Sequence, residues 1–226
     1  MKRSTDRILT THTGSLARPA GLLEMMAAKE AGQPYDRDAY AATVRSAVSD
    51  IVRRQAETGV DILCDGEQSK PGFFTYVSDR LTGFEPLDAP QRAGPWEGSR
   101  EVQSFPEYYE LYARGRSPNV SAPFGMVCTG PVTYRGHEQI KTDLDNLKAA
   151  LQGINPEEVF VPSSSATNVE AQRRNEYYPS DEAYLHAIAD AMREEYHAIL
   201  DAGFLLQIDD PRLVTFYVSR PDLTIE

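Results

Sequence analysis

The chain has 226 residues, a hydrophobic fraction of 41% and a formal net charge of −11. Length and composition predict one globular domain over 1–226, and the acidic balance argues against binding to nucleic acid or an anionic membrane, because both require clustered Lys and Arg. No targeting pattern opens the chain and no run approaches the roughly 20 apolar residues that span a bilayer, so we expect a cytoplasmic protein with small-molecule or protein partners.

The first predicted elements alternate between short apolar strands and a helix. Residues 7–11 predict a strand that runs into a polar turn at 12–15. Apolar residues then recur at helical spacing over 36–57, and Gly59 provides a helix stop. An apolar strand at 61–64 follows directly and ends in Asp-Gly-Glu.

The middle of the chain predicts a long excursion from this pattern. Residues 83–123 are rich in Pro and Gly, with one weak strand expected at 100–104. The aromatic side chains in this stretch are Trp96, Phe105, Tyr108, Tyr109 and Tyr112. So much apolar area is unusual for a linker between domains, and we expect the excursion to be packed by its own aromatic residues.

The second half repeats the plan of the first. A strand is predicted at 125–128, a helix at 140–151 and a brief strand at 159–161. Ser180 is a suitable N-cap for a helix that reaches Gly203, and the apolar strand 204–208 follows and ends in Asp-Asp-Pro. The two Cys residues, Cys64 and Cys128, lie in apolar runs and are expected to be reduced and buried.

A helix joined to an apolar strand by one or two residues is typical of a parallel sheet covered on both faces. The prediction is an α/β fold of the (β/α)8 TIM-barrel type, with about five or six of the eight units present. Residues 221–226 resemble the start of a helix that does not continue, so we expect a barrel that is incomplete at its C-terminus.

Acidic residues follow two of the predicted strands. In a parallel sheet, ligands bind at the carboxyl ends of the strands, so Glu67 and Asp209 are expected to project into one mouth and to hold an ammonium group. For Asp65 and Asp210, a turn or a helix cap is an equally good interpretation.

The turn after the first strand offers Thr13, Gly14 and Ser15, whose hydroxyl and backbone N–H groups suit a carboxylate or another anion. Such turns are common, so this motif is weak by itself. The four His residues lack the spacing of a metal site and are expected at the surface or in helix packing.

Four motifs together resemble the catalytic barrel of cobalamin-independent methionine synthase. They are Thr-Thr-His-Thr-Gly-Ser at 10–15, Asp-Gly-Glu at 65–67, Cys-Thr-Gly-Pro-Val-Thr at 128–133 and Gln-Ile-Asp-Asp-Pro at 207–211. The segments at 161–165 and 175–182 are more similar to the short, single-barrel relatives, which include zinc-dependent epoxyalkane:coenzyme M transferases.

The resemblance implies methyl transfer from a methylated folate (a 5-methyltetrahydrofolate polyglutamate) to the zinc-activated thiol of homocysteine. Carried over, Ser15 and the backbone around Thr13 would hold the homocysteine carboxylate, and Glu67 and Asp209 would hold its amino group. Zinc would lower the pKa of the thiol.

The chain departs from the family in its metal site. The family's zinc ligands lie beyond the strand that ends at Pro211, and the residues after Pro211 include neither His nor Cys. We therefore expect an N-terminal portion without the zinc ligands, inactive alone, that self-associates or pairs with a complementing C-terminal half. Two alternatives remain open: an alkyl transferase that uses coenzyme M, and a non-catalytic binding or assembly module.

Overall fold

The computed structural model describes residues 1–87, 98–114, 125–171 and 173–222. The helices in this part are α1 (Ala20–Glu30), α2 (Arg37–Glu57), α3 (Val77–Arg80), α4 (Arg100–Ser104), α5 (Pro106–Arg114), α6 (His137–Ala150), α7 (Ala166–Ala171), α8 (Asp181–Asp201) and α9 (Arg212–Ser219). The strands are β1 (Ile62–Leu63), β2 (Phe84–Pro86), β3 (Met126–Cys128), β4 (Glu158–Ser164), β5 (Arg173–Asn175) and β6 (Leu205–Asp209). None of the described helices is long and apolar enough to cross a membrane.

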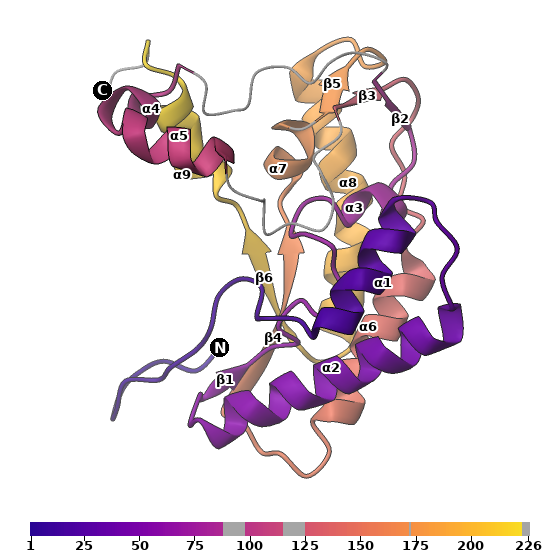
Figure 1. Ribbon diagram of the computed structural model, residues 1–226, viewed down its shortest axis with the longest axis vertical. Helices are drawn as coiled ribbons and strands as arrows, with labels where there is room; N and C mark the ends of the chain where they lie inside the picture. Colours follow the sequence, from indigo (N-terminus) through magenta and orange to yellow (C-terminus); the bar gives the residue numbers. More distant parts are fainter. Residues whose placement is uncertain (88–97, 115–124, 172, 223–226) are drawn as a thin grey trace.

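The two longest described strands, β4 and β6, form a parallel sheet with the short strand β1, in the order β1-β4-β6 (Figure 1). Ser164 at the end of β4 pairs in register with Asp209 at the end of β6. The predicted first strand at 7–11 is wrong: only Thr11 forms a bridge, to Ile62. The Thr10 carbonyl accepts from the backbone N–H of Ile62 at 3.0 Å, and side chains supply further bonds of this segment: Asp61 accepts from the Thr10 N–H at 2.7 Å and from the Arg7 guanidinium at 2.6 Å.

The two long predicted helices are confirmed, and so is the predicted N-cap at Ser180. Asp36 accepts hydrogen bonds from two N–H groups of the first turn of α2, each at 3.0 Å, and Ser180 accepts from Ala183 N at 3.1 Å in α8. Gly59 and Gly203 follow the helices with positive φ, as the stop signals predicted. The caps and glycines thus define where each helix begins and ends, and the next strand starts within a few residues of each glycine.

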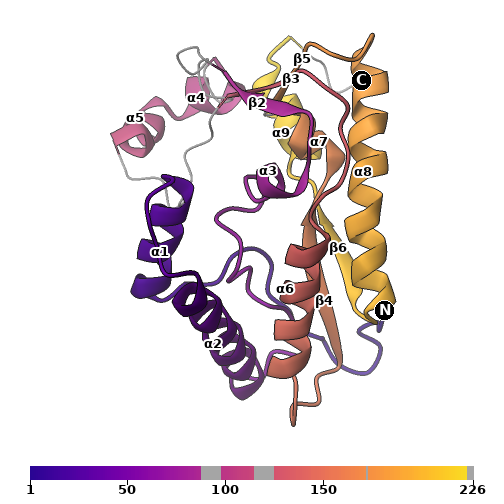
Figure 2. The same ribbon diagram turned by 90° about the vertical axis from the view of Figure 1, so that its right-hand side faces the viewer.

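One hydrophobic core joins this sheet to its helices. Val161 of β4 packs in a cluster with Val48 of α2, Leu147 of α6 and Ile199 of α8. Figure 2 shows α8 running along β4 and β6. Because successive side chains of a strand alternate between its faces, Val161 and Ser163 face the helices, whereas Pro162 and Ser164 lie on the opposite face.

The described residues also form a second sheet, which a single barrel would not have. Its order is β2-β3-β5, with β2 antiparallel to β3 and β3 parallel to β5. The strand predicted at 125–128 is confirmed as β3, but it does not share a sheet with β1 and β4. The α/β class is confirmed, while the described residues form two open three-stranded sheets and not a closed barrel.

The excursion at 83–123 is partly helical. Residues 100–104, predicted as a strand, form α4 because the Ser99 hydroxyl caps it, accepting from Val102 N at 3.2 Å. Tyr108 and Tyr109 stack edge to face at 5.1 Å, yet Phe105 and Tyr108 are exposed, and Trp96 lies outside the described residues. Figure 1 shows α4, α5 and α9 grouped at one corner; α9 has no counterpart in the prediction.

A buried polar network joins α8 to α3 and to β4. Glu195 of α8 is fully buried, and its carboxylate accepts from four donors: Tyr76 at 2.7 Å, Ser163 at 2.8 Å, Tyr134 at 2.8 Å and Arg80 at 2.9 Å. Arg80 also pairs with Asp143 of α6 at 2.5 Å. Every polar atom of the carboxylate is therefore satisfied, as a buried charge requires.

Candidate functional site

The strand end after β1 is a tight turn. Asp65 is buried and its Oδ1 accepts from the Glu67 N–H at 2.9 Å. Gly66 and Glu67 both have positive φ, of 61° and 55°. A Cβ on Gly66 would lie 3.2 Å from side-chain atoms of Ile51 and Leu16, so the turn is closely packed and glycine is favoured there.

Glu67 lies inside this turn. Its side chain is 1% exposed, and its Oε2 accepts from the Ser15 hydroxyl at 2.5 Å. Arg18 donates to the backbone oxygens of Glu67 at 2.8 Å and of Lys70 at 2.6 Å. The structure therefore brings the predicted residues Ser15 and Glu67 together, with Arg18 fixing the loop between them.

Asp209 ends β6 and is half buried. Burial raises the pKa of its carboxyl group above the usual value, and the negative charge of Glu67 raises the pKa further. The Gln207 amide opposes these effects by donating to Asp209 Oδ1 at 2.6 Å, and the charge of Lys70 opposes them too. Glu67 follows β1 and Asp209 ends β6, the two strands that flank β4, and the charge of Glu67 is close enough to affect the pKa of Asp209.

The other predicted residues occupy the loop before α1. Gly14 adopts a φ of +86°, in the left-handed region that glycine enters readily, and Thr13 and Ser15 are exposed at residue level. The role of Thr13, Gly14 and Ser15 in holding an anion stays a prediction. In this conformation the Ser15 hydroxyl is already engaged with Glu67.

Several polar side chains near the strand ends were not singled out from the sequence. Lys70 is buried, with its Nζ donating to the Pro162 carbonyl and lying 4.7 Å from the centre of the Tyr76 ring. Gln207 lies on β6 two residues before Asp209, and Ser164 of the neighbouring strand β4 pairs with Asp209. The polar run Ser163-Ser164-Ser165 after an apolar strand was the available signal for Ser164, while nothing in the local pattern marks Lys70 as buried.

Asp210 has a structural role of the kind considered from the sequence. Its Oδ1 accepts from the Thr167 hydroxyl at 2.8 Å, which links the end of β6 to α7. Asn168 of α7 donates to the Asp209 carbonyl at 2.7 Å. The loop after β6 is thus held by α7, which fixes the backbone of Asp209.

The zinc expected from the resemblance does not fit this part of the protein. Across residues 1–87, 98–114, 125–171 and 173–222, no three His, Cys, Asp or Glu side chains form a group that could hold a metal ion. Cys64 and Cys128 are buried and reduced. Burial raises the pKa of the Cys64 thiol to about 12, so it is a poor thiolate donor.

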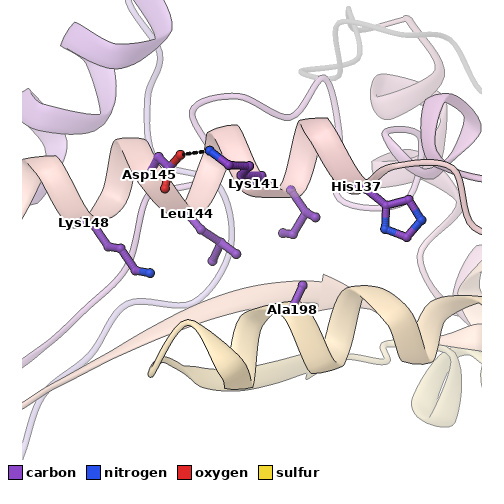
Figure 3. Close-up of a pocket in the computed structure, with 7 residues that line it drawn as sticks. His137, Lys141, Leu144, Asp145, Lys148 and Ala198 are labelled. Atoms are coloured by element: carbon purple, nitrogen blue, oxygen red, sulfur yellow. Dashed lines mark hydrogen bonds and ion pairs between the residues drawn. The ribbon is translucent and has the colours of Figure 1, made fainter.

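A surface pocket of 340 Å³ lies between α6 and α8 (Figure 3). Its lining residues are His137, Ile140, Lys141, Leu144, Asp145, Lys148 and Ala198, and they include none of the candidate site residues. Lys141 and Asp145 pair with each other at 2.6 Å across one turn of α6. The pocket is a groove between helices and is separate from the strand ends.

These features describe an α/β protein with a cluster of polar and carboxylate side chains at the carboxyl ends of a parallel sheet, where such folds usually bind small molecules. Comparison with known proteins identifies the relatives. No protein-family model matches the chain. The chain is 25% identical over 207 residues to a methionine synthase of Sulfolobus acidocaldarius and 22% identical over 206 residues to one of Pyrococcus furiosus.

The solved structures with similar folds are also methionine synthases. A B12-independent methionine synthase of a Shewanella species, solved with selenomethionine, superposes with a TM-score of 0.63 at 18% identity and covers 94% of the chain. The corresponding Listeria monocytogenes protein gives a TM-score of 0.60 at 19% identity and covers 92%. The family resemblance drawn from the four motifs is confirmed: homologues named methionine synthase cover 91% of the chain, and the similar folds are those of B12-independent methionine synthases.

The match covers only part of each relative. The chain spans 52% of the length of both the Sulfolobus and the Pyrococcus proteins, and 54% of each solved chain. The activity and substrates of the whole enzyme are therefore not transferred to this chain by similarity alone.

Proposed function

We propose that this chain forms the amino-acid-binding part of a methionine-synthase-like methyltransferase. In this proposal the carboxylates of Glu67 and Asp209 accept hydrogen bonds from the amino group of homocysteine or a similar aminothiol. The methyl group would come from a methylated folate. The homology to methionine synthases supports the methyltransferase role in methionine synthesis.

The observation that carries the proposal is the electrostatic coupling of Asp209 to Glu67. Burial is the main cause of the raised pKa of Asp209, and repulsion by the negative charge of Glu67 raises the pKa further. An ammonium group placed between them relieves this repulsion and forms charge-assisted hydrogen bonds. The strand ends are therefore better suited to a cation than to an anion.

Binding of the amino group requires a small rearrangement at Glu67. Its side chain is buried and its Oε2 is bonded to Ser15, whereas Asp209 is half buried. A ligand would meet Asp209 first and would reach Glu67 as the Ser15 hydroxyl turns away. The released hydroxyl of Ser15, with the N–H groups around Thr13 and Gly14, would then be available to the ligand carboxylate.

The described residues bind and orient the aminothiol in this proposal, and the activation of its thiol is not assigned to them. They do not fit a zinc site, because no three His, Cys, Asp or Glu side chains of the described residues form a group that could hold a metal ion. Methyl transfer by this chain alone is thus not expected from the described residues.

Calorimetric titration of the full chain tests the amino-group sites. L-homocysteine, under reducing conditions, is compared with coenzyme M, a thiol that lacks the amino group. Glu67→Gln and Asp209→Asn are each expected to weaken homocysteine binding by about tenfold or more, the scale of a lost charge-assisted hydrogen bond.

Asp210→Asn is the matched control, since Asp210 neighbours Asp209 but bonds to Thr167. Its affinity is expected within about twofold of the wild type. Equal affinity of the wild type for both thiols, or full affinity in Glu67→Gln and Asp209→Asn, would overturn the proposal. Tighter binding of coenzyme M would favour the alternative alkyl transferase.

A further inference from the structure

Ser164 combines deep burial with an unused hydroxyl group. Its residue is 1% exposed, and its Oγ has no hydrogen-bond partner. Its backbone is fully engaged: the N–H donates to the Tyr76 hydroxyl at 3.1 Å and the carbonyl accepts from the Tyr196 hydroxyl at 2.7 Å. A buried hydroxyl without a partner costs free energy, so a ligand that supplies one is favoured.

The strand register places this hydroxyl beside the proposed site. Ser164 pairs with Asp209, and residues paired in register on parallel strands project from the same face of the sheet. The preceding residue shows the alternation, since Ser163 donates to Glu195 on the helix side at 2.8 Å. Ser164 therefore projects from the face that carries Asp209 and Gln207, away from α8.

The number of acceptors matches the number of donors on an ammonium group. An ammonium bound to carbon has three N–H donors. Glu67 and Asp209 each offer carboxylate oxygens, although one oxygen of each accepts from Ser15 or Gln207. The Ser164 hydroxyl offers a further lone pair, on the strand that lies between β1 and β6.

We propose that Ser164 Oγ is the third acceptor for the ligand amino group, so that Ser164 with Glu67 and Asp209 makes the site specific for a primary ammonium. This inference rests on the proposed function and assigns a specificity-determining role to a residue outside the four motifs at 10–15, 65–67, 128–133 and 207–211. No bond is made or broken in this step. The hydroxyl hydrogen of Ser164 turns away from the ammonium as the oxygen accepts.

The test compares two ligands that differ only in the amino group, L-homocysteine and 4-mercaptobutanoic acid. Their dissociation constants are measured by calorimetry for the wild-type chain and for Ser164→Ala. The wild type is expected to prefer homocysteine, and Ser164→Ala is expected to lower this preference by about tenfold through weaker binding of homocysteine alone. The ratio cancels any general loosening of the site.

Two further variants keep the result interpretable. Ser163→Ala removes a neighbouring hydroxyl that bonds to Glu195, and it is expected to lower the thermal midpoint while leaving the ligand preference unchanged. Ser164→Cys, which retains the shape with a weaker acceptor, replaces Ser164→Ala if that protein does not fold, and a lower preference is expected there too.

An unchanged preference in the folded Ser164 variant overturns the role of Ser164 and leaves the proposed function standing. A wild type without preference for homocysteine overturns both.

Discussion

Replacement of Glu195 by glutamine perturbs the polar network that joins α8 to α3 and β4. Oε1 of Glu195 accepts from Tyr76 and Ser163, and Oε2 accepts from Arg80 and Tyr134. Glutamine keeps the shape but removes the negative charge that faces Arg80. With the amide oxygen toward Arg80 and Tyr134, the NH2 group can donate to the hydroxyls of Tyr76 and Ser163, which turn to accept, so the main loss is the charge opposite Arg80.

The cost follows from the burial of Arg80, whose side chain is 6% exposed. Removal of one partner of a buried ion pair typically costs 3–5 kcal/mol, and because Arg80 keeps Asp143, the lower end of about 3 kcal/mol applies. For a chain of this size, that corresponds to a fall of roughly 6–12 °C in the midpoint of thermal unfolding.

Urea and thermal unfolding followed by circular dichroism measure this change. Glu194→Gln is the matched control, since Glu194 is the preceding residue of the same helix, is 54% exposed and pairs with His137 at the surface. It is expected to stay within about 0.5 kcal/mol of the wild type. A Glu195→Gln protein as stable as Glu194→Gln would refute the assignment of this network as a stabilising element.

The remaining predictions concern pH, thiol chemistry and association. Burial by itself would raise the pKa of Glu195, but Arg80, Lys70 and the hydroxyl donors outweigh burial and lower the pKa to about 2, from 4.5. A carboxyl group whose pKa is lower in the folded than in the unfolded state stabilises the fold at pH values above the unfolded pKa, and this contribution is lost as the pH falls toward the folded pKa. The difference in unfolding free energy between wild type and Glu195→Gln is therefore expected to close between pH 4.5 and 2. A difference that is independent of pH in denaturant titrations would contradict this. Because burial raises the pKa of Cys64 to about 12, Ellman's reagent is expected to modify Cys64 only after unfolding. Peptide mass spectrometry identifies the modified residue, with Cys64→Ser as the control. Rapid modification of Cys64 in the native protein would contradict this expectation. Ile208, Leu213 and Val214 expose 50%, 78% and 69% of their area near the end of β6, so we expect association through this surface, and sedimentation equilibrium that finds a monomer at all concentrations would contradict it.

Much of the helical architecture could be predicted because it depends on local chemistry. The caps Asp36 and Ser180, the apolar spacing of α2 and α8, and the stops at Gly59 and Gly203 act within a few residues. The strands that follow these helices were predictable for the same reason. They are short apolar runs that a helix stop places directly against the core.

The pairing of strands could not be predicted in this way. Within residues 7–11, the Thr10 N–H donates to the side chain of Asp61, which lies far along the sequence, and the Leu9 N–H donates to the Ser4 hydroxyl. Met126–Cys128 of β3 is as apolar as β4, yet it pairs with β2 and β5, and local composition does not determine which sheet a strand joins. Residues 100–104 became a helix because the cap at Ser99 outweighed a weak strand pattern.

The candidate site was predictable at Glu67 and Asp209, since both follow apolar strands with an acidic ending. The residues that surround them were not, because Lys70, Ser164 and Gln207 acquire their importance from burial and register. Ser15 shows a further limit. The sequence predicted that Ser15 and Glu67 belong to the same binding site, and the two residues do lie side by side. The hydrogen bond between them could not be predicted, because it depends on the conformation of the loop that Arg18 stabilises.

A crystal structure of the full chain with bound L-homocysteine tests the central claim most directly. The account predicts the ligand nitrogen at about 3 Å from a carboxylate oxygen of Glu67 and from one of Asp209, the ordinary length of a charge-assisted hydrogen bond. A ligand whose amino group points to solvent, or one bound away from the carboxyl ends of β1 and β6, would contradict it.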